Sequence, residues 1–69
     1  MEKDLDEAFQ WFSKAAAQGY AVALNNLGSC YEYGKGVKKN MQTAISLYRK
    51  AAEKGQKNGI SALSRLGVR

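Results

Sequence analysis

The side chains that could perform chemistry in this chain are few and poorly grouped. The nucleophiles are one cysteine, Cys30, and five serines, namely Ser13, Ser29, Ser46, Ser61 and Ser64. The chain has no histidine, so the usual general base and the commonest metal ligand of proteins are absent. No serine has a recognisable base partner in the sequence. We therefore expect a protein without catalysis, bound metal or bound cofactor.

The acidic residues are arranged for helix stability rather than for acid–base catalysis. Four of the six fall within the first seven positions, and these are Glu2, Asp4, Asp6 and Glu7. Acidic side chains at a helix start complement the helix dipole, and Asp4 followed by Glu7 has the spacing of a capping box. The sequence thus predicts a helix whose cap is Asp4.

Composition narrows the class of protein further. A single cysteine cannot form an internal disulfide, and no apolar run approaches the ~20 residues that span a bilayer. The beginning of the chain lacks the apolar core of a signal peptide. These features favour a cytoplasmic location. On its predicted helix, we expect Cys30 to be a half-buried packing thiol rather than a nucleophile.

The net charge of +5 raises the alternative of a nucleic-acid-binding surface. From Ala8 onward the chain has ten basic residues and only two acidic ones. The basic residues that could form such a surface are Lys35, Lys38, Lys39, Arg49, Lys50 and Lys54. No aromatic-and-basic nucleic-acid motif accompanies them, so we favour a solvated helical surface. The alternative predicts binding that weakens steeply with salt.

The elements that position these side chains are encoded by a repeat of 36 residues. AAAQGY at positions 15–20 returns as AAEKGQ at positions 51–56. Before and within each phrase, apolar residues recur at steps of three and four, which is typical of one helix face. The first face comprises Leu5, Ala8, Phe9, Phe12, Ala15 and Ala16, and the second comprises Met41, Ala44, Ile45, Tyr48, Ala51 and Ala52. A period of this length predicts a helical array.

A helix of a second kind is predicted to begin near Ala21. Its apolar stripe comprises Leu24, Leu27, Gly28 and Tyr31. A glycine inside a helix costs about 1 kcal/mol relative to alanine, so we expect a neighbouring helix to approach Gly28 closely. Asn40 is predicted to cap the start of the next helix, and Gly19 and Gly55 are predicted to end the two similar helices in left-handed conformations.

The chain resembles a Sel1-like repeat, of the TPR-like α-solenoid superfamily, in the motif Ala23-x-x-x-Leu27-Gly28-x-x-Tyr31-x-x-Gly34-x-Gly36-Val37 and then Ala44-x-x-x-Tyr48-x-x-Ala51-Ala52-x-x-Gly55. The resemblance implies an all-α fold of about four helices, paired as antiparallel hairpins and stacked into a solenoid. It divides the single domain of residues 1–69 into the second helix of one repeat (4–18), a complete repeat (21–56) and a partial or capping helix (57–69). It also implies an adaptor or scaffold that binds a protein or peptide partner without catalysis.

The last predicted helix departs from this pattern. Shifted by 36 residues, Gly28 falls on Ser64 and Tyr31 falls on Gly67. A Leu-Gly pair occurs at Leu66–Gly67, three residues late. Either this helix contains a small insertion or it has stopped following the repeat, as a terminal cap or a truncated array would.

The face of the second helix opposite its apolar stripe is the candidate binding surface. Its residues are Val22, Asn25, Asn26, Ser29 and Tyr33. In the family that the chain resembles, the first helix of each repeat faces inward. Asparagine can bond a partner's backbone as both donor and acceptor, and tyrosine supplies contact area at low entropic cost. Asn26 is the strongest single candidate, and the alternative is that these residues are simply exposed to solvent.

Self-association is a second interpretation of the same array. Helical repeats need about three copies to cover their stacked faces, and this chain has about two. The apolar residues expected at uncovered ends are Phe9, Trp11, Leu63, Leu66 and Val68. Exposed apolar edges promote docking of another chain, so the protein would then be an assembly module joined through its ends.

Overall fold

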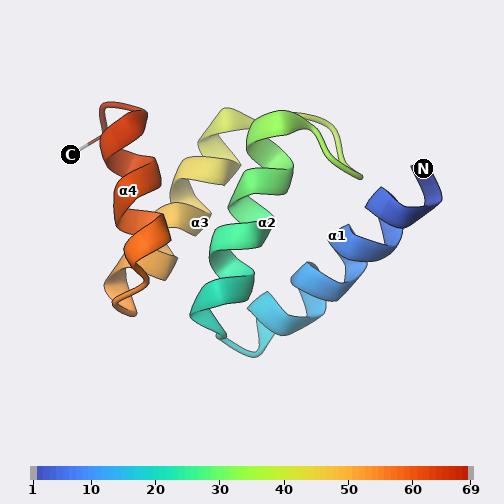
Figure 1. Cartoon of the computed structure of the whole chain (residues 1–69), viewed down its shortest axis with the longest axis horizontal. Helices are drawn as coiled ribbons and strands as arrows, with labels where there is room; N and C mark the ends of the chain where they lie inside the picture. Colours follow the sequence, from blue (N-terminus) through green and yellow to red (C-terminus); the bar gives the residue numbers. More distant parts are fainter. Residues whose placement is uncertain (1, 69) are drawn as a thin grey trace.

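Four helices follow one another along the chain and pack as an antiparallel array (Figure 1). The computed structural model describes the backbone of residues 2–68 and the side chains of residues 6–68. The helices are α1 (Glu2–Ala17), α2 (Ala21–Tyr33), α3 (Met41–Glu53) and α4 (Lys57–Arg65). Residues 2–68 include no strand. The predicted all-α fold of about four helices is therefore confirmed.

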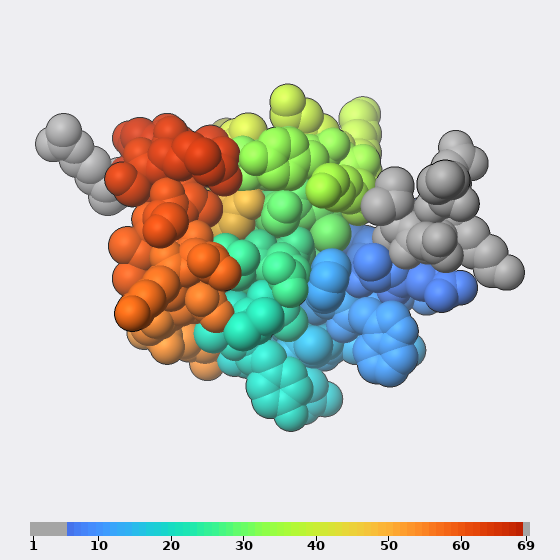
Figure 2. Space-filling view, viewed as in Figure 1, coloured from blue at the N-terminus to red at the C-terminus, as the bar shows by residue number. Residues whose placement is uncertain are grey.

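Each helix packs against the next one in the sequence, and the contact between α2 and α3 is the most extensive. As a result, α1 and α4 lie at opposite ends of the array (Figure 1). The space-filling view shows the same order, with α1 in blue at one end and α4 in orange and red at the other (Figure 2). This is the arrangement of stacked helix hairpins that the sequence predicts.

The predicted boundary signals of α3 are confirmed. Asn40 precedes the helix in an extended conformation, and its Oδ1 accepts a hydrogen bond of 3.1 Å from the backbone N–H of Thr43. This bond satisfies one of the donors that a helix start leaves without an intrahelical partner. After the helix, Gly55 has a φ of 84°, and Gly19 has a φ of 88° at the equivalent place after α1. Glycine adopts this left-handed conformation without steric penalty.

The predicted cap of α1 is wrong. The helix begins at Glu2, so the backbone of Asp4 lies inside α1 rather than at its boundary. Glutamate and lysine are strong helix formers, and Glu2 and Lys3 extend the helix beyond the expected cap. A capping box needs its first residue at the helix boundary, so this position of Asp4 also rules out the predicted box with Glu7. The side chain of Asp4 itself lies outside the described residues.

The core is centred on one face of α3. Ala44, Tyr48 and Ala51 have exposed fractions of 0%, 2% and 0%. A β-carbon added at Gly28 of α2 would lie 2.9 Å from the Tyr48 ring, which confirms the predicted close approach. A β-carbon added at Gly59 of α4 would lie 2.9 Å from the carbonyl oxygen of Tyr48. This second close approach was not predicted from the sequence.

The last helix, α4, ends where its sequence departs from the repeat. The helix has nine residues, against 13 in α2, and it ends at Arg65. Leu66 caps the helix, and Gly67 follows with a left-handed φ of 74°. Leu66 and Gly67 therefore end a helix, whereas the Leu27–Gly28 pair lies inside α2. Whether residues 57–69 form a partial repeat or a capping helix stays a prediction.

Candidate functional site

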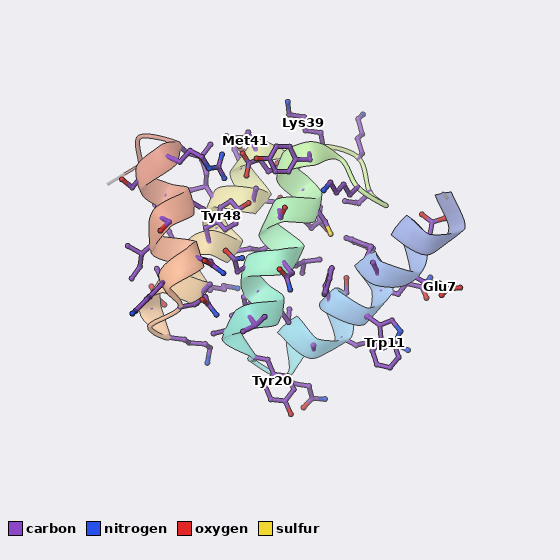
Figure 3. The ribbon with its side chains drawn as sticks, in the orientation of Figure 1. Glu7, Trp11, Tyr20, Lys39, Met41 and Tyr48 are labelled. Atoms are coloured by element: carbon purple, nitrogen blue, oxygen red, sulfur yellow. The ribbon has the colours of Figure 1, made fainter. Side chains whose placement is uncertain are left out.

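A groove of about 460 Å³ runs between α2 and α4, with α3 behind it. We call it the α2–α4 groove. Its lining residues are Asn25, Ser29, Tyr33, Tyr48, Asn58, Ser61, Ala62 and Arg65. Tyr48 of α3 lies between α2 and α4 (Figure 3). The groove is therefore built from three helices that belong to two successive repeats.

Helix periodicity explains why polar side chains gather on both walls. Asn25, Ser29 and Tyr33 recur at steps of four along α2, and residues at this spacing share one helix face. On α4, Asn58, Ser61 and Arg65 recur at steps of three and four. Because α2 and α4 both rest on α3, these two polar faces line the same groove.

A buried carboxylate joins the three helices of the groove. Glu32 of α2 is 5% exposed, and its Oε1 accepts a hydrogen bond of 2.7 Å from the Tyr48 hydroxyl. Arg65 of α4 donates from one guanidinium nitrogen to Oε2 at 2.7 Å and from the other to Oε1 at 2.9 Å. This two-bond geometry is the strong, directional form of the arginine–carboxylate pair. It fixes the position of α4 relative to α2.

The electrostatics of this network keep it ionised. The hydrogen bond from Arg65 is the main reason why the pKa of Glu32 falls from 4.5 to about 2, and the Tyr48 hydroxyl lowers the pKa further against the opposing effect of burial. Burial and the neighbouring Glu32 carboxylate raise the pKa of Tyr48 above its ordinary value. Glu32 is therefore negative and Tyr48 neutral at pH 7, and the Glu32 charge is balanced by Arg65.

The structure divides the predicted binding face between two hollows. Asn25, Ser29 and Tyr33 line the α2–α4 groove. Val22 and Asn26 instead line an apolar hollow of about 330 Å³ between α1 and α2, and the other residues of that hollow are Trp11, Phe12, Ala15, Tyr20 and Ala23. The five residues thus lie on the same helix but do not form one site within the described residues. Their role in partner binding stays a prediction.

Several groove residues were not predicted from the sequence. Asn58 and Ser61 stand 36 residues after Val22 and Asn25, so shifting the predicted face by one repeat would have found them. The Glu32–Arg65 pair has no such signal, because its members are 33 residues apart on helices that are not consecutive. Tyr48 was predicted as a core residue, and its additional hydrogen bond to Glu32 was not.

The other candidate side chains lie outside the groove. The six basic residues proposed for nucleic-acid binding are all exposed, three in the α2–α3 connection and three at the end of α3. Cys30 is buried rather than half-buried, and burial raises the pKa of its thiol, as expected for a packing residue. The described residues contain no cluster of three or more potential metal ligands. None of the helices that they form has the length and apolarity to span a membrane.

Comparison with known proteins identifies the repeat. The sequence profile of the Sel1 repeat matches residues 1–20 and 21–56, which is most of the chain. The chain belongs to the Sel1 repeat family. Its membership of this family, together with relatives that are named as regulators, supports a general role as a protein-interaction module.

Its similar proteins are much longer than the chain. It is 47% identical over 62 residues to the chitin synthase regulator SKT5 of Saccharomyces cerevisiae, covering 90% of this chain and 9% of that protein. Chitin synthase regulatory factor 3 of Schizosaccharomyces pombe is 35% identical over 51 residues, covering 74% of this chain and 6% of the relative. The DAP3-binding cell death enhancer 1 of Mus musculus is 43% identical over 42 residues, with coverages of 61% and 8%. No solved structure gives a significant match.

Proposed function

We propose that this Sel1 repeat chain is an adaptor module that binds an extended segment of a partner protein in the α2–α4 groove. The observation that supports this proposal is a groove of about 460 Å³, lined mostly by polar residues, whose walls on α2 and α4 are joined by the Glu32–Arg65 pair. Binding in such a groove needs no chemical step. The relatives named as chitin synthase regulators and as a DAP3-binding protein are consistent with a module that acts through contact with other proteins.

The chemistry of the walls suits a peptide backbone. Asn25 and Asn58 lie on opposite walls, and neither side-chain amide takes part in the side-chain hydrogen bonds found among residues 6–68. Each amide can donate to a backbone carbonyl and accept from a backbone N–H of a bound strand. Tyr33, which is 57% exposed, offers aromatic contact area at the same edge of the groove.

The charges at the groove balance each other, which favours an uncharged partner segment. Arg65 is half exposed, but two of its five N–H groups bind Glu32 and its charge is balanced there, so we expect it to attract an acidic side chain only weakly. The pair carries no net charge. We therefore expect a partner segment with polar or small apolar side chains, and an affinity that changes little with salt. A nucleic-acid surface would behave in the opposite way, because phosphate binding releases counterions.

The proposal is tested with short random peptides displayed on phage and selected against the chain, followed by titration of the chain with a selected peptide in solution. The expected result is that Asn25→Ala combined with Asn58→Ala weakens binding about tenfold, as the loss of two hydrogen bonds would. Gln42→Ala is the matched control, because Gln42 is exposed on α3 outside the groove.

Two outcomes would reject the α2–α4 groove as the site. One is a failure to select any peptide that binds the folded chain. The other is a selected peptide whose affinity is unchanged by the groove variants but reduced by Asn26→Ala. The latter result would assign binding to the apolar hollow between α1 and α2.

A further inference from the structure

The connection between α2 and α3, residues 34–40, carries three exposed lysines and no acidic residue. The lysines are Lys35, Lys38 and Lys39, and we call this segment the basic loop. Among the side chains of residues 6–68, the one ion pair is that of Arg65 with Glu32. No carboxylate in that part of the chain therefore pairs with the three lysines, and their charges can attract an acidic partner.

The basic loop is held against the end of α2 by two backbone hydrogen bonds. The N–H of Lys35 donates to the carbonyl oxygen of Cys30 at 2.9 Å, and the N–H of Asn40 donates to the carbonyl oxygen of Tyr31 at 2.9 Å. Both ends of the loop are thus bound to the last turn of α2. A backbone that is already fixed spares a partner the entropic cost of ordering it.

The basic loop begins where the α2–α4 groove ends. Tyr33 lines the groove, and the Nζ of Lys35 lies over its ring, 5.5 Å from the ring centroid. A β-carbon added at Gly34 would lie 3.5 Å from the Cβ of Lys39, so the loop returns to the same end of the groove. The Lys39 side chain points away from the helices (Figure 3). A segment that leaves the groove at Tyr33 would therefore meet these lysines next.

We propose that acidic side chains of the partner bind the basic loop, next to the uncharged segment that occupies the α2–α4 groove. This inference rests on the proposed function and specifies its partner further, because a short run of aspartate or glutamate should adjoin one end of the uncharged segment. Charge complementarity supports it. The Glu32–Arg65 pair is balanced within the chain, whereas the three lysines have no such partner among the described side chains.

The distribution of the basic residues favours an acidic protein segment over a nucleic acid. The basic loop precedes α3, whereas Arg49, Lys50 and Lys54 lie at the other end of that helix, whose 13 residues span about 20 Å. The six residues thus form two groups rather than one continuous track for a phosphate backbone. Single-stranded nucleic acids also bind by stacking on aromatic rings, and Lys35 covers one face of Tyr33.

The test extends a peptide that has been selected for the α2–α4 groove. A run of three glutamates is added to its N-terminal or its C-terminal end, and runs of three glutamines serve as uncharged controls. Each peptide is titrated against the chain at about 10 mM and at about 1 M salt. One glutamate extension should raise the affinity about fivefold at low salt, since exposed ion pairs are individually weak. This gain should vanish at about 1 M salt, where the screening length is about 3 Å.

The basic-loop variant combines Lys35→Gln, Lys38→Gln and Lys39→Gln. It should abolish the gain from that extension. Its affinity for the unextended peptide should match that of the parent chain, because the three lysines do not line the groove. Circular dichroism confirms that the helices of the variant are intact.

The matched control removes the same charge at the end of α3, by Arg49→Gln, Lys50→Gln and Lys54→Gln. It should retain the gain from the extension. An equal loss in the control and in the basic-loop variant would overturn the proposal, because the net charge of the chain and not the basic loop would then attract the glutamates.

Two further results would also overturn it. One is that neither glutamate extension binds more tightly than its glutamine control. The other is that a single-stranded thymidine oligonucleotide binds the basic loop more tightly than the extended peptide does, which would assign the loop to nucleic acid. In each of these cases the unextended peptide still binds and the groove stands. If no peptide can be selected at all, the proposed function fails, and the role of the basic loop fails with it.

Discussion

Glu32 is the residue at which burial and charge conflict most strongly. Its carboxylate is 5% exposed, yet it stays ionised because Arg65 and Tyr48 donate three hydrogen bonds to it. A buried ion pair adds little net stability, but the loss of one partner leaves a buried charge without compensation. The pair should therefore matter more for the position of α4 than for the total free energy of unfolding.

Arg65→Ala should lower the free energy of unfolding more than an exposed control substitution does, but by less than the loss typical of a fully buried pair, because Arg65 is half exposed. Urea denaturation followed by circular dichroism at pH 7 measures the change. Arg49→Ala is the control, since Arg49 is exposed on α3, and it should change stability by less than about 0.5 kcal/mol. Equal effects of the two variants would show that the Glu32 network does not hold α4.

The same residue predicts a pH dependence with a defined sign. The pKa of Glu32 is about 2 in the folded chain and 4.5 in its ordinary state. Between these values the unfolded chain binds the proton more readily, so stability should fall as the pH falls from about 4.5 to about 2, by about 1–3 kcal/mol in total. Above this window the contribution is complete.

Thermal melts between pH 2 and pH 7 test this dependence. In the parent chain the melting temperature should fall as the pH is lowered below about 4.5. Glu32→Gln should reduce this fall, which we call the acid limb, because the titrating group is gone. Glu53→Gln removes an exposed carboxylate of α3 and should leave the limb unchanged. An acid limb that survives in Glu32→Gln would assign the pH dependence to other carboxylates.

At the scale of the helices, the closest approach is that of α2 to α3 at Gly28. Gly28→Ala would gain about 1 kcal/mol of helix propensity. Its β-carbon, however, would lie 2.9 Å from the Tyr48 ring, and overpacking of a core typically costs about 1–3 kcal/mol. Because Tyr48 is held by Glu32, its ring cannot move freely, so we expect a net loss of about 1 kcal/mol.

Urea denaturation of Gly28→Ala measures that balance. The matched control is Ser64→Ala at the equivalent position of α4, which is exposed and should be neutral or slightly stabilising. A Gly28→Ala variant more stable than the parent chain would mean that the Tyr48 ring yields and that the close approach is not required.

The helices were predictable from the sequence, and the groove was only partly so. Periodic apolar stripes and local signals such as Asn40 act within one helix, so they can be read along the chain. The start of α1 was missed because helix formers such as Glu2 carry the helix past Asp4. The groove depends on how α2 and α4 lie across α3, and pairs such as Glu32 with Arg65 leave no local pattern.

At the scale of the whole molecule, the predicted binding face is divided between the hollow of α1 and α2 and the groove of α2 and α4. Asn25 lines the α2–α4 groove, and the next residue, Asn26, lines the apolar hollow. Asn25→Ala should therefore weaken the binding of a peptide held in the groove, whereas Asn26→Ala should leave its affinity unchanged. Titration of both variants with the same peptide measures the difference, and equal losses would show that the two hollows act as one site.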